Sequence, residues 1–181
     1  MAPPPPGHVI RTQRLLLRPV GVADAERLVQ IQLNWNVSRM LRMADYPPKR
    51  ESMSAWLATA PQEWARGTAF RFAVIKDGVV IGCADIDEIA DGWGDLGYWF
   101  DEASWGAGLA TEAAAAVRDF AFMDLNLDGL RSEHAADNSA SGRVLVRLGF
   151  RHVADERRWS KARSAEIDQR VYRLAVRAPQ P

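Results

Sequence analysis

The residues whose types and spacing most clearly suggest a binding site lie between Gly97 and Ala113, where the chain reads G-Y-W-F-D-E-A-S-W-G-A-G-L-A-T-E-A. A strand-like run leads into a loop with Gly106 and Gly108, and a helical pattern begins at about Ala110. Glycines let backbone N–H groups turn inward, and a helix N-terminus adds unpaired donors and a positive dipole end. The segment therefore suits an anion such as a pyrophosphate, although a glycine loop that only turns a strand into a helix has the same pattern.

Two common nucleotide-binding loops do not fit this spacing. A P-loop ends in Gly-Lys-Ser/Thr, but Gly108 is followed by Leu109 and Ala110. The dinucleotide fingerprint needs glycine or alanine three residues after its second glycine, and Thr111 stands there. The spacing thus disfavours a nucleotide-binding oxidoreductase.

The composition is that of one ordinary domain. The chain has 181 residues, 48% of them hydrophobic and 25% charged, with 23 basic and 23 acidic side chains. The lack of a basic excess argues against nucleic-acid binding, and no apolar run is long enough for a membrane span. One cysteine, Cys83, excludes an internal disulfide, and the three histidines lack metal-ligand spacing. We expect a cytoplasmic protein that binds no metal, nucleic acid or membrane.

The order of elements predicts a mixed α+β fold rather than a doubly wound sheet. Residues 1–8 are expected to form a flexible proline-rich arm, residues 9–177 one domain, and residues 178–181 a tail. Asp-Gly pairs at 77–78 and 91–92 predict hairpin turns. Strands are predicted at 12–20, 70–76, 79–89, 93–100, 130–135, 150–159 and 169–177. Helices are predicted at 22–33, 51–66 with an interruption near Pro61, 111–125 and 139–148.

Three separated motifs resemble the GNAT superfamily of N-acetyltransferases. They are residues 97–100, the loop 105–113, and Asp-Asn-Ser-Ala-Ser at 137–141 followed by Leu-Gly-Phe at 148–150. The closest branch is the Rim type, whose best-known members acetylate the N-terminal amines of ribosomal proteins. The resemblance runs from Thr12 to about Leu174. It implies a mostly antiparallel, twisted sheet of about seven strands, splayed between the fourth and fifth, with helices on both faces and acetyl-CoA in the split.

The resemblance also assigns residues to acetyl-CoA. The family's pyrophosphate loop, Gln/Arg-x-x-Gly-x-Gly/Ala, matches Trp105 to Ala110. Trp105 replaces the usual Gln or Arg, and Ala107 stands where Lys or Arg is frequent. One cationic phosphate contact is therefore missing unless Arg143 or Arg147 supplies it. The implied loop contacts are Trp105, Gly106, Ala107, Gly108, Leu109, Ala110 and Thr111.

In the family the strand before this loop pairs with the pantetheine arm, which implies a role for Tyr98, Trp99 and Phe100. A backbone N–H there would polarise the thioester carbonyl; the three side chains can equally be core aromatics. Asn138 resembles the residue that binds the CoA arm, and Ser141 resembles the one that hydrogen-bonds the leaving thiolate. Both are also preferred helix N-caps, so that reading stays open.

An amine acceptor is mostly protonated at neutral pH, so a base is required. Glu133, five residues before Asn138, has the spacing of the base glutamate in some Rim-type enzymes. Asp95 matches a position where the family often has Glu; Asp87 and Glu88 are weaker candidates. Strand alternation points His134 to the opposite face from Glu133. An acyl-enzyme at Cys83 is disfavoured, because a lone cysteine in an apolar strand is more often an inert core residue.

The expected function is acetyl-CoA-dependent transfer of an acetyl group to a primary amine, directly within a ternary complex. The acceptor is a protein N-terminus or a small-molecule amine, and the sequence does not specify which. A homodimer is compatible with the sequence, which does not fix the oligomeric state. A group of large side chains in the first third could form an aromatic wall for the acceptor or a core: Trp35, Met40, Tyr46, Trp56 and Trp64. The alternative is a non-catalytic acetyl-CoA-binding sensor or interaction module, which would keep the glycine loop and lose the base.

Overall fold

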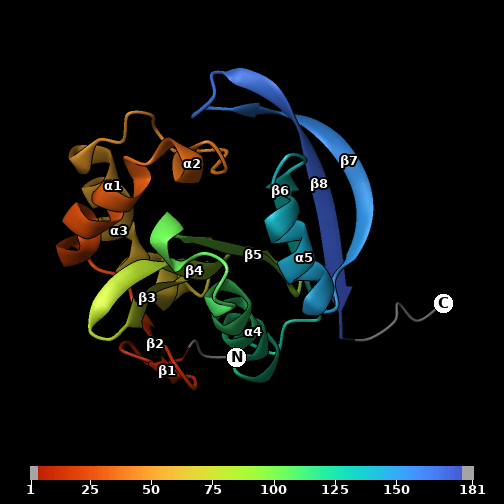
Figure 1. Cartoon of the computed structure of the whole chain (residues 1–181). Coiled ribbons are helices and arrows are strands. Elements are labelled where there is room, and N and C mark those ends of the chain that lie inside the picture. Colours follow the sequence, from red (N-terminus) through yellow and green to blue (C-terminus); the bar gives the residue numbers. More distant parts are fainter. Residues whose placement is uncertain (1–3, 177–181) are drawn as a thin grey trace.

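The structure, a computed structural model, describes residues 4–176. Its centre is one eight-stranded sheet of order β1-β2-β3-β4-β5-β6-β8-β7 (Figure 1). Only β5 and β6 pair in parallel. The strands are β1 (Ile10–Arg11), β2 (Leu16–Pro19), β3 (Phe70–Lys76), β4 (Val79–Ala90), β5 (Trp93–Phe100), β6 (Gly129–Ala135), β7 (Arg151–Ser160) and β8 (Ala165–Ala175). The mixed α+β class and mostly antiparallel sheet are confirmed; the eighth strand arises because a short β1 precedes β2.

Helices cover both faces of this sheet (Figure 1). The helices are α1 (Ala25–Gln32), α2 (Trp35–Ser38), α3 (Arg50–Arg66), α4 (Leu109–Met123) and α5 (Ser139–Arg147), with 3₁₀ turns at Val22–Asp24 and Glu102–Ser104. Leu28 of α1 and Leu57 of α3 are buried in one core with Cys83 of β4. Val117 of α4 and Leu145 of α5 are buried in a second, larger core. The sheet thus separates an α1–α3 side from an α4–α5 side.

The turn chemistry read from the sequence is confirmed. Asp77 and Gly78, between β3 and β4, have φ of 50° and 78°, and Asp91 and Gly92, between β4 and β5, have 50° and 76°. Two successive positive φ angles are what a tight two-residue hairpin turn demands. Three antiparallel strands, β3, β4 and β5, therefore follow one another without crossover.

Several predicted boundaries differ from the structure. The strand predicted at 12–20 is limited to β2, and the helix predicted at 22–33 is a 3₁₀ turn followed by α1. Helix α3 runs unbroken through Pro61, because Leu57, Ala60 and Trp64 bury one face of it and tertiary packing offsets the local cost of proline, about 3 kcal/mol. Helix α2 was not predicted; it has one turn, capped by the Asn34 side chain, which accepts from the Asn36 N–H. Strand β8 begins before residue 169 because β7 pairs along its whole length.

The N-terminal arm contacts the domain where it is described. The Trp64 indole N–H donates to the Pro4 carbonyl at 2.8 Å, and the His8 ring lies 5.0 Å from that of Phe120. Flexibility of residues 1–8 as a whole stays a prediction. The predicted tail, 178–181, and the predicted end of the last strand at residue 177 lie outside the described residues.

The sheet splits between β5 and β6. These strands pair only at their first residues, ending with Asp95 opposite Arg131, and the Ser132 hydroxyl still donates to the Leu96 carbonyl at 2.8 Å. Beyond that point β5 stays paired with β4 as far as Phe100, while β6 stays paired with β8 as far as Ala135. The expected splay is confirmed, and it leaves the backbone edges of both strands facing a gap.

Candidate active site

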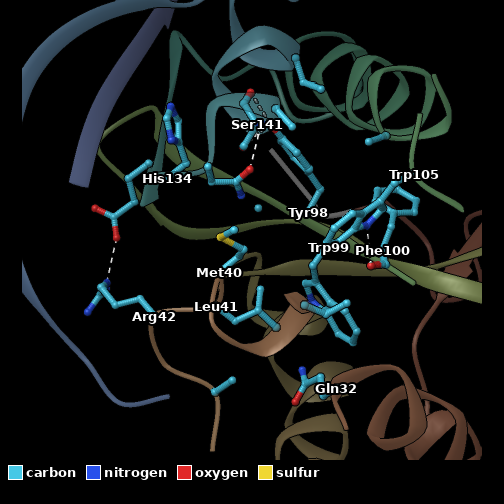
Figure 2. A pocket seen from close by; sticks show the side chains of 18 of the residues that line it. Gln32, Met40, Leu41, Arg42, Tyr98, Trp99, Phe100, Trp105, His134 and Ser141 are labelled. Carbon is cyan, nitrogen blue, oxygen red and sulfur yellow. Dashed lines mark hydrogen bonds and ion pairs between the residues drawn. The ribbon is translucent and has the colours of Figure 1, made fainter. Parts of the chain in front are cut away.

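The split opens into a cleft of about 900 Å³ (Figure 2). Its walls come from β5, the loop to α4, the turn from β6 to α5, and the segment between α2 and α3. Most sequence-predicted residues line it: Tyr98, Trp99, Phe100, Trp105, Gly106, Gly108, Leu109, Ala110, Thr111, Glu133, Asn138 and Ser141. The fold thus brings the three separated motifs to one cavity, whereas Ala107 and Asp95 are not among the lining residues.

The glycine loop has the geometry of an anion site. Gly106 and Gly108 have φ of 76° and 77°, in the left-handed region that favours glycine. Gly108 caps α4 without a side-chain hydrogen bond, so the first N–H groups of the helix have no capping side chain. Leu109, Ala110 and Thr111 carry these groups at the cleft wall, where they and the helix dipole can bind phosphate oxygens.

An arginine outside the motifs holds this loop from behind. The Arg14 guanidinium donates from Nη1 to the Ala107 carbonyl at 2.8 Å and from Nε to Glu112 of α4 at 2.6 Å. The Thr12 hydroxyl donates to the same carboxylate at 2.6 Å, and these contacts lower the pKa of Glu112 against the effect of its burial. Sequence reasoning missed this role because about a hundred residues separate the partners. Arg14 thus provides a positive charge at this loop, where Ala107 replaces the basic residue that is frequent in the family.

Two further cations reach the cleft from α5. Arg143 and Arg147 both line it, and Arg143 donates to the Ser139 hydroxyl at 3.1 Å. They are the side chains that the sequence offered as substitutes for a basic residue at Ala107. That Arg143 or Arg147 contacts a phosphate therefore stays a prediction.

Trp105 is fixed against β5. Its indole N–H donates to the Phe100 carbonyl at 3.0 Å, while the residue is 46% exposed (Figure 2). The single donor of the ring is therefore committed to the backbone. What Trp105 can offer a ligand is a ring face at the cleft wall rather than a hydrogen bond.

A hydroxyl pair bridges the two sides of the split. The Tyr98 hydroxyl lies 2.8 Å from the Ser141 hydroxyl and donates to the Ser141 carbonyl at 3.1 Å (Figure 2). Burial raises the pKa of the Tyr98 hydroxyl, which therefore stays protonated. Asn138 caps α5, because its side-chain oxygen accepts from the Ser141 N–H at 3.2 Å. The capping role predicted for Asn138 is thus present, and its amide nitrogen has no hydrogen bond among residues 4–176.

The predicted bases have different surroundings. Glu133 lines the cleft, but Arg42 is 2.9 Å and Arg158 3.6 Å from its carboxylate oxygens. Asp95 has a buried oxygen with no hydrogen-bond partner, and burial, with the charge of Glu88, raises its pKa to about 6. Asp87 lines the cleft and lies 3.6 Å from Arg71.

A further carboxylate, Asp85 of β4, lines the cleft and was not singled out from the sequence. In the β4–β5 register Asp85 lies opposite Gly97, the residue that precedes Tyr98 in β5. Burial, followed by the charge of Asp87, raises the pKa of Asp85 to about 7. The signal that could have found it is a charged residue at an inward position of an apolar strand.

Ion pairs join the rim of the cleft on the α1–α3 side. Asp137 pairs at 2.9 Å with both Arg39 and Arg163, and Lys161 pairs with Asp45 at 2.5 Å. These contacts connect the segment after α2 to the β7–β8 turn, which curves toward α2 in Figure 1. The cleft is therefore bordered on this side by charged groups that are largely paired.

The large side chains of the first third divide between cleft and surface or core. Met40 and Trp56 line the cleft. Trp35 and Tyr46 contact each other with ring centres 4.6 Å apart, outside the lining. Trp64 packs against Phe70, Phe72 and Phe120 in the core.

Two other sequence candidates are buried. Cys83 is fully buried, and burial raises the pKa of its thiol, which does not favour a nucleophile. His134 is 4% exposed at the cleft, and its Nδ1 lies 2.8 Å from the Ala135 carbonyl. Within residues 4–176 no cluster of metal-ligating side chains is present, and no helix there has the length and hydropathy needed to cross a bilayer.

Comparison with known proteins identifies the family. Residues 14–151 match the acetyltransferase (GNAT) domain. The chain belongs to the GNAT acetyltransferase family. The uncharacterized N-acetyltransferase p20 of Bacillus licheniformis is 26% identical over 174 residues, covering 94% of this chain and 97% of that protein.

Solved structures resemble this GNAT domain along its length. Mycobacterium smegmatis RimJ in complex with CoA-disulfide has a TM-score of 0.87 at 24% identity, over 99% of this chain and 93% of that chain. RimL, the ribosomal L7/L12 alpha-N-protein acetyltransferase in complex with coenzyme A, has a TM-score of 0.84 at 19% identity, over 93% and 98%. The likeness to the Rim-type branch is one of fold, and it agrees with the resemblance seen in the motifs.

Proposed function

We propose that this acetyltransferase transfers an acetyl group from acetyl-CoA to a primary amine, directly within a ternary complex. The observation that carries the proposal is the split sheet. On its α4–α5 side lie the uncapped helix N-terminus behind Gly106 and Gly108 and the Tyr98–Ser141 hydroxyl pair. On its α1–α3 side lies Asp85, a carboxylate that lines the cleft and is in no ion pair among residues 4–176. RimJ and RimL, which share the fold, are described as complexes with CoA or its disulfide.

The chain's residues divide the work as follows. Backbone N–H groups at 106–111 bind the pyrophosphate, and Arg14 holds their loop in place. The free edge of β5 pairs with the pantetheine arm, and a β5 N–H polarises the thioester carbonyl, an effect of about 3 kcal/mol on the barrier. The Ser141 hydroxyl turns its hydrogen from the Tyr98 oxygen to the sulfur and donates to it as the C–S bond breaks.

The acceptor we propose first is the N-terminal amine of a protein. RimL is named as an alpha-N-protein acetyltransferase of ribosomal L7/L12. Four acidic side chains at the cleft, Asp45, Asp87, Glu133 and Asp137, are each in an ion pair. Asp85 is in none among residues 4–176, so it is the carboxylate open to a group that arrives as an ammonium ion. A small-molecule amine meets the same chemistry and is the second acceptor to test.

The proposal is tested by thiol release from acetyl-CoA, measured with peptides that have free N-termini and with spermidine. Turnover with at least one amine, and a matching gain of one acetyl group in its mass, is the expected result. If acetyl-CoA binds but no amine releases thiol, the chain is the non-catalytic binding module that the sequence left as the alternative. If acetyl-CoA does not bind, the proposal fails altogether.

Replacing Ser141 by alanine should lower the turnover number more than it weakens acetyl-CoA binding. The hydrogen bond to sulfur gains strength as negative charge forms, so it acts mainly in the transition state. A bond to a charged group contributes about 1.5–3 kcal/mol, which predicts a loss of roughly ten- to a hundredfold.

Ser139→Ala is the matched control, because Ser139 lies at the cleft in the same turn of α5 and, among residues 4–176, its hydroxyl only accepts from Arg143. Steady-state kinetics and calorimetry would be run on both variants. A Ser141→Ala enzyme that keeps its rate and loses only thermal stability would show that this serine is merely part of the helix cap.

A further inference from the structure

We propose that Asp85 is the catalytic base that takes the proton from the acceptor amine. This inference rests on the proposed acetyl transfer. It concerns a residue of β4 that lies outside the three motifs. Four structural observations support it: the position of Asp85 in the sheet, its place in the cleft, the lack of an ion pair, and the pairing of its competitor Glu133.

The strand register places Asp85 opposite the part of β5 to which we assign the thioester. Asp85 is opposite Gly97, and the neighbouring pair is Ala84 with Tyr98. Since side chains alternate along a strand, Asp85 lies on the α1–α3 side of the sheet, while Tyr98 points to Ser141 on the α4–α5 side. A base on the α1–α3 side would meet an amine that approaches the thioester through the split.

Gly97 leaves the room that this carboxylate uses. A Cβ on Gly97 would collide with Oδ1 of Asp85, so the carboxylate occupies the space over the β5 backbone. Asp85 is only 9% exposed, yet it lines the cleft. A buried carboxylate at the cleft surface can reach a ligand while bulk water is largely excluded.

Asp85 is in no ion pair among the described residues. Arg71, its register partner on β3, pairs with Glu63 of α3 and with Asp87. The groups that face Asp85 are thus Arg71, Asp87 and Glu63, together with a hydrogen bond from the Gly97 backbone. Burial, then the charge of Asp87, raises the pKa of Asp85 to about 7, which is near the operating pH and suits a proton acceptor.

Glu133 has the opposite surroundings. One guanidinium group lies at each of its oxygens, Arg42 at 2.9 Å from Oε1 and Arg158 at 3.6 Å from Oε2, so neither oxygen is open to an acceptor amine. Asp95 has the burial of a base but does not line the cleft.

The proposed step balances as follows. The ammonium group of the acceptor gives one proton to the Asp85 carboxylate and becomes a neutral amine. Its lone pair attacks the thioester carbonyl carbon, the C–N bond forms, and the C–S bond breaks with its electron pair going to sulfur. The second proton lost by nitrogen ends on the CoA sulfur, and Asp85 releases its proton to water.

The test compares Asp85→Asn with Asp87→Asn, a matched control on the same strand face, and with Glu133→Gln. The readout is kcat/KM for the best amine of the peptide and spermidine panel as a function of pH. Wild type should show an acidic limb with a midpoint near 7. Asp85→Asn should lose that limb and about 10²-fold or more in rate at neutral pH. Glu133→Gln should keep the limb unchanged, and Asp87→Asn should keep it with a lower midpoint, because the charge of Asp87 helps to raise the pKa of Asp85.

Calorimetry with acetyl-CoA separates this inference from the proposed function. Asp85→Asn should bind acetyl-CoA within about twofold of wild type, because its side chain is on the opposite side of the sheet from the loop. An Asp85→Asn enzyme with the wild-type profile, a limb lost instead in Glu133→Gln, or a flat wild-type profile would each overturn the assignment. An inactive wild type would instead overturn the proposed acetyl transfer.

Discussion

Replacing Gly108 by valine is expected to weaken acetyl-CoA binding by about 100-fold or more. The φ of 77° at Gly108 is unfavourable for a β-branched residue, so the loop must shift and its N–H groups must leave their positions at the cleft. Each hydrogen bond to a charged phosphate contributes about 1.5–3 kcal/mol, and two such bonds exceed a factor of 100. Isothermal titration calorimetry measures the effect directly.

Gly67→Val is the matched control for this variant. Gly67 ends α3 with φ of 70° and has open space around its Cα, so valine there introduces a similar backbone strain far from the glycine loop. Both variants should lose thermal stability, but only Gly108→Val should lose affinity. Equal affinity in the two folded variants would mean that the loop does not bind the pyrophosphate.

Ionisation of Asp85 is also expected to lower the free energy of unfolding as the pH rises. Its pKa is raised from 3.8 to about 7 in the folded state, so the native protein binds this proton more tightly than the unfolded chain does. The free energy of unfolding should therefore fall between about pH 4 and pH 7. Asp87 and Asp95, whose pKa values are also raised, contribute with the same sign. His134, whose pKa is lowered, contributes with the opposite sign just below pH 6.5.

The variant Asp85→Asn isolates this contribution. At pH 8 it should be more stable than wild type by on the order of 2–4 kcal/mol, and near pH 4 the advantage should vanish. Denaturant titrations of both proteins across this range measure the difference, in which the Asp87, Asp95 and His134 contributions largely cancel. A difference that does not change with pH would show that the Asp85 carboxyl has an ordinary pKa. A destabilising group kept at a cleft is consistent with a functional role.

The sequence predicted those features that local chemistry decides. The Asp-Gly turns and the glycine loop before α4 each follow from the conformational range of a few neighbouring residues. The resemblance to the family, carried by the same short motifs, added the split between β5 and β6. Family, fold class and twelve of the residues that line the cleft could therefore be predicted from the amino-acid sequence.

The features that were missed depend on contacts between distant segments. Pro61 stays inside α3 because the burial of Leu57 and Trp64 offsets the unfavourable free energy of a proline inside a helix. The sequence shows the proline but not the burial. The contact of Arg14 with Ala107 and that of Arg42 with Glu133 join residues more than ninety positions apart. The ion pairs of Glu133 and the unpaired carboxylate of Asp85 depend on such contacts. Spacing along a strand could therefore suggest a base, but it could not predict which charged groups surround it.

The most direct test of the account is a crystal structure of the protein with CoA bound. The account predicts the pyrophosphate against the N–H groups of residues 106–111 and the pantetheine arm along the free edge of β5. The sulfur should lie within hydrogen-bonding reach of the Ser141 hydroxyl, and Asp85 should lie on the α1–α3 side of the sheet. CoA bound outside the split, or in the split with its sulfur away from both Tyr98 and Ser141, would contradict it.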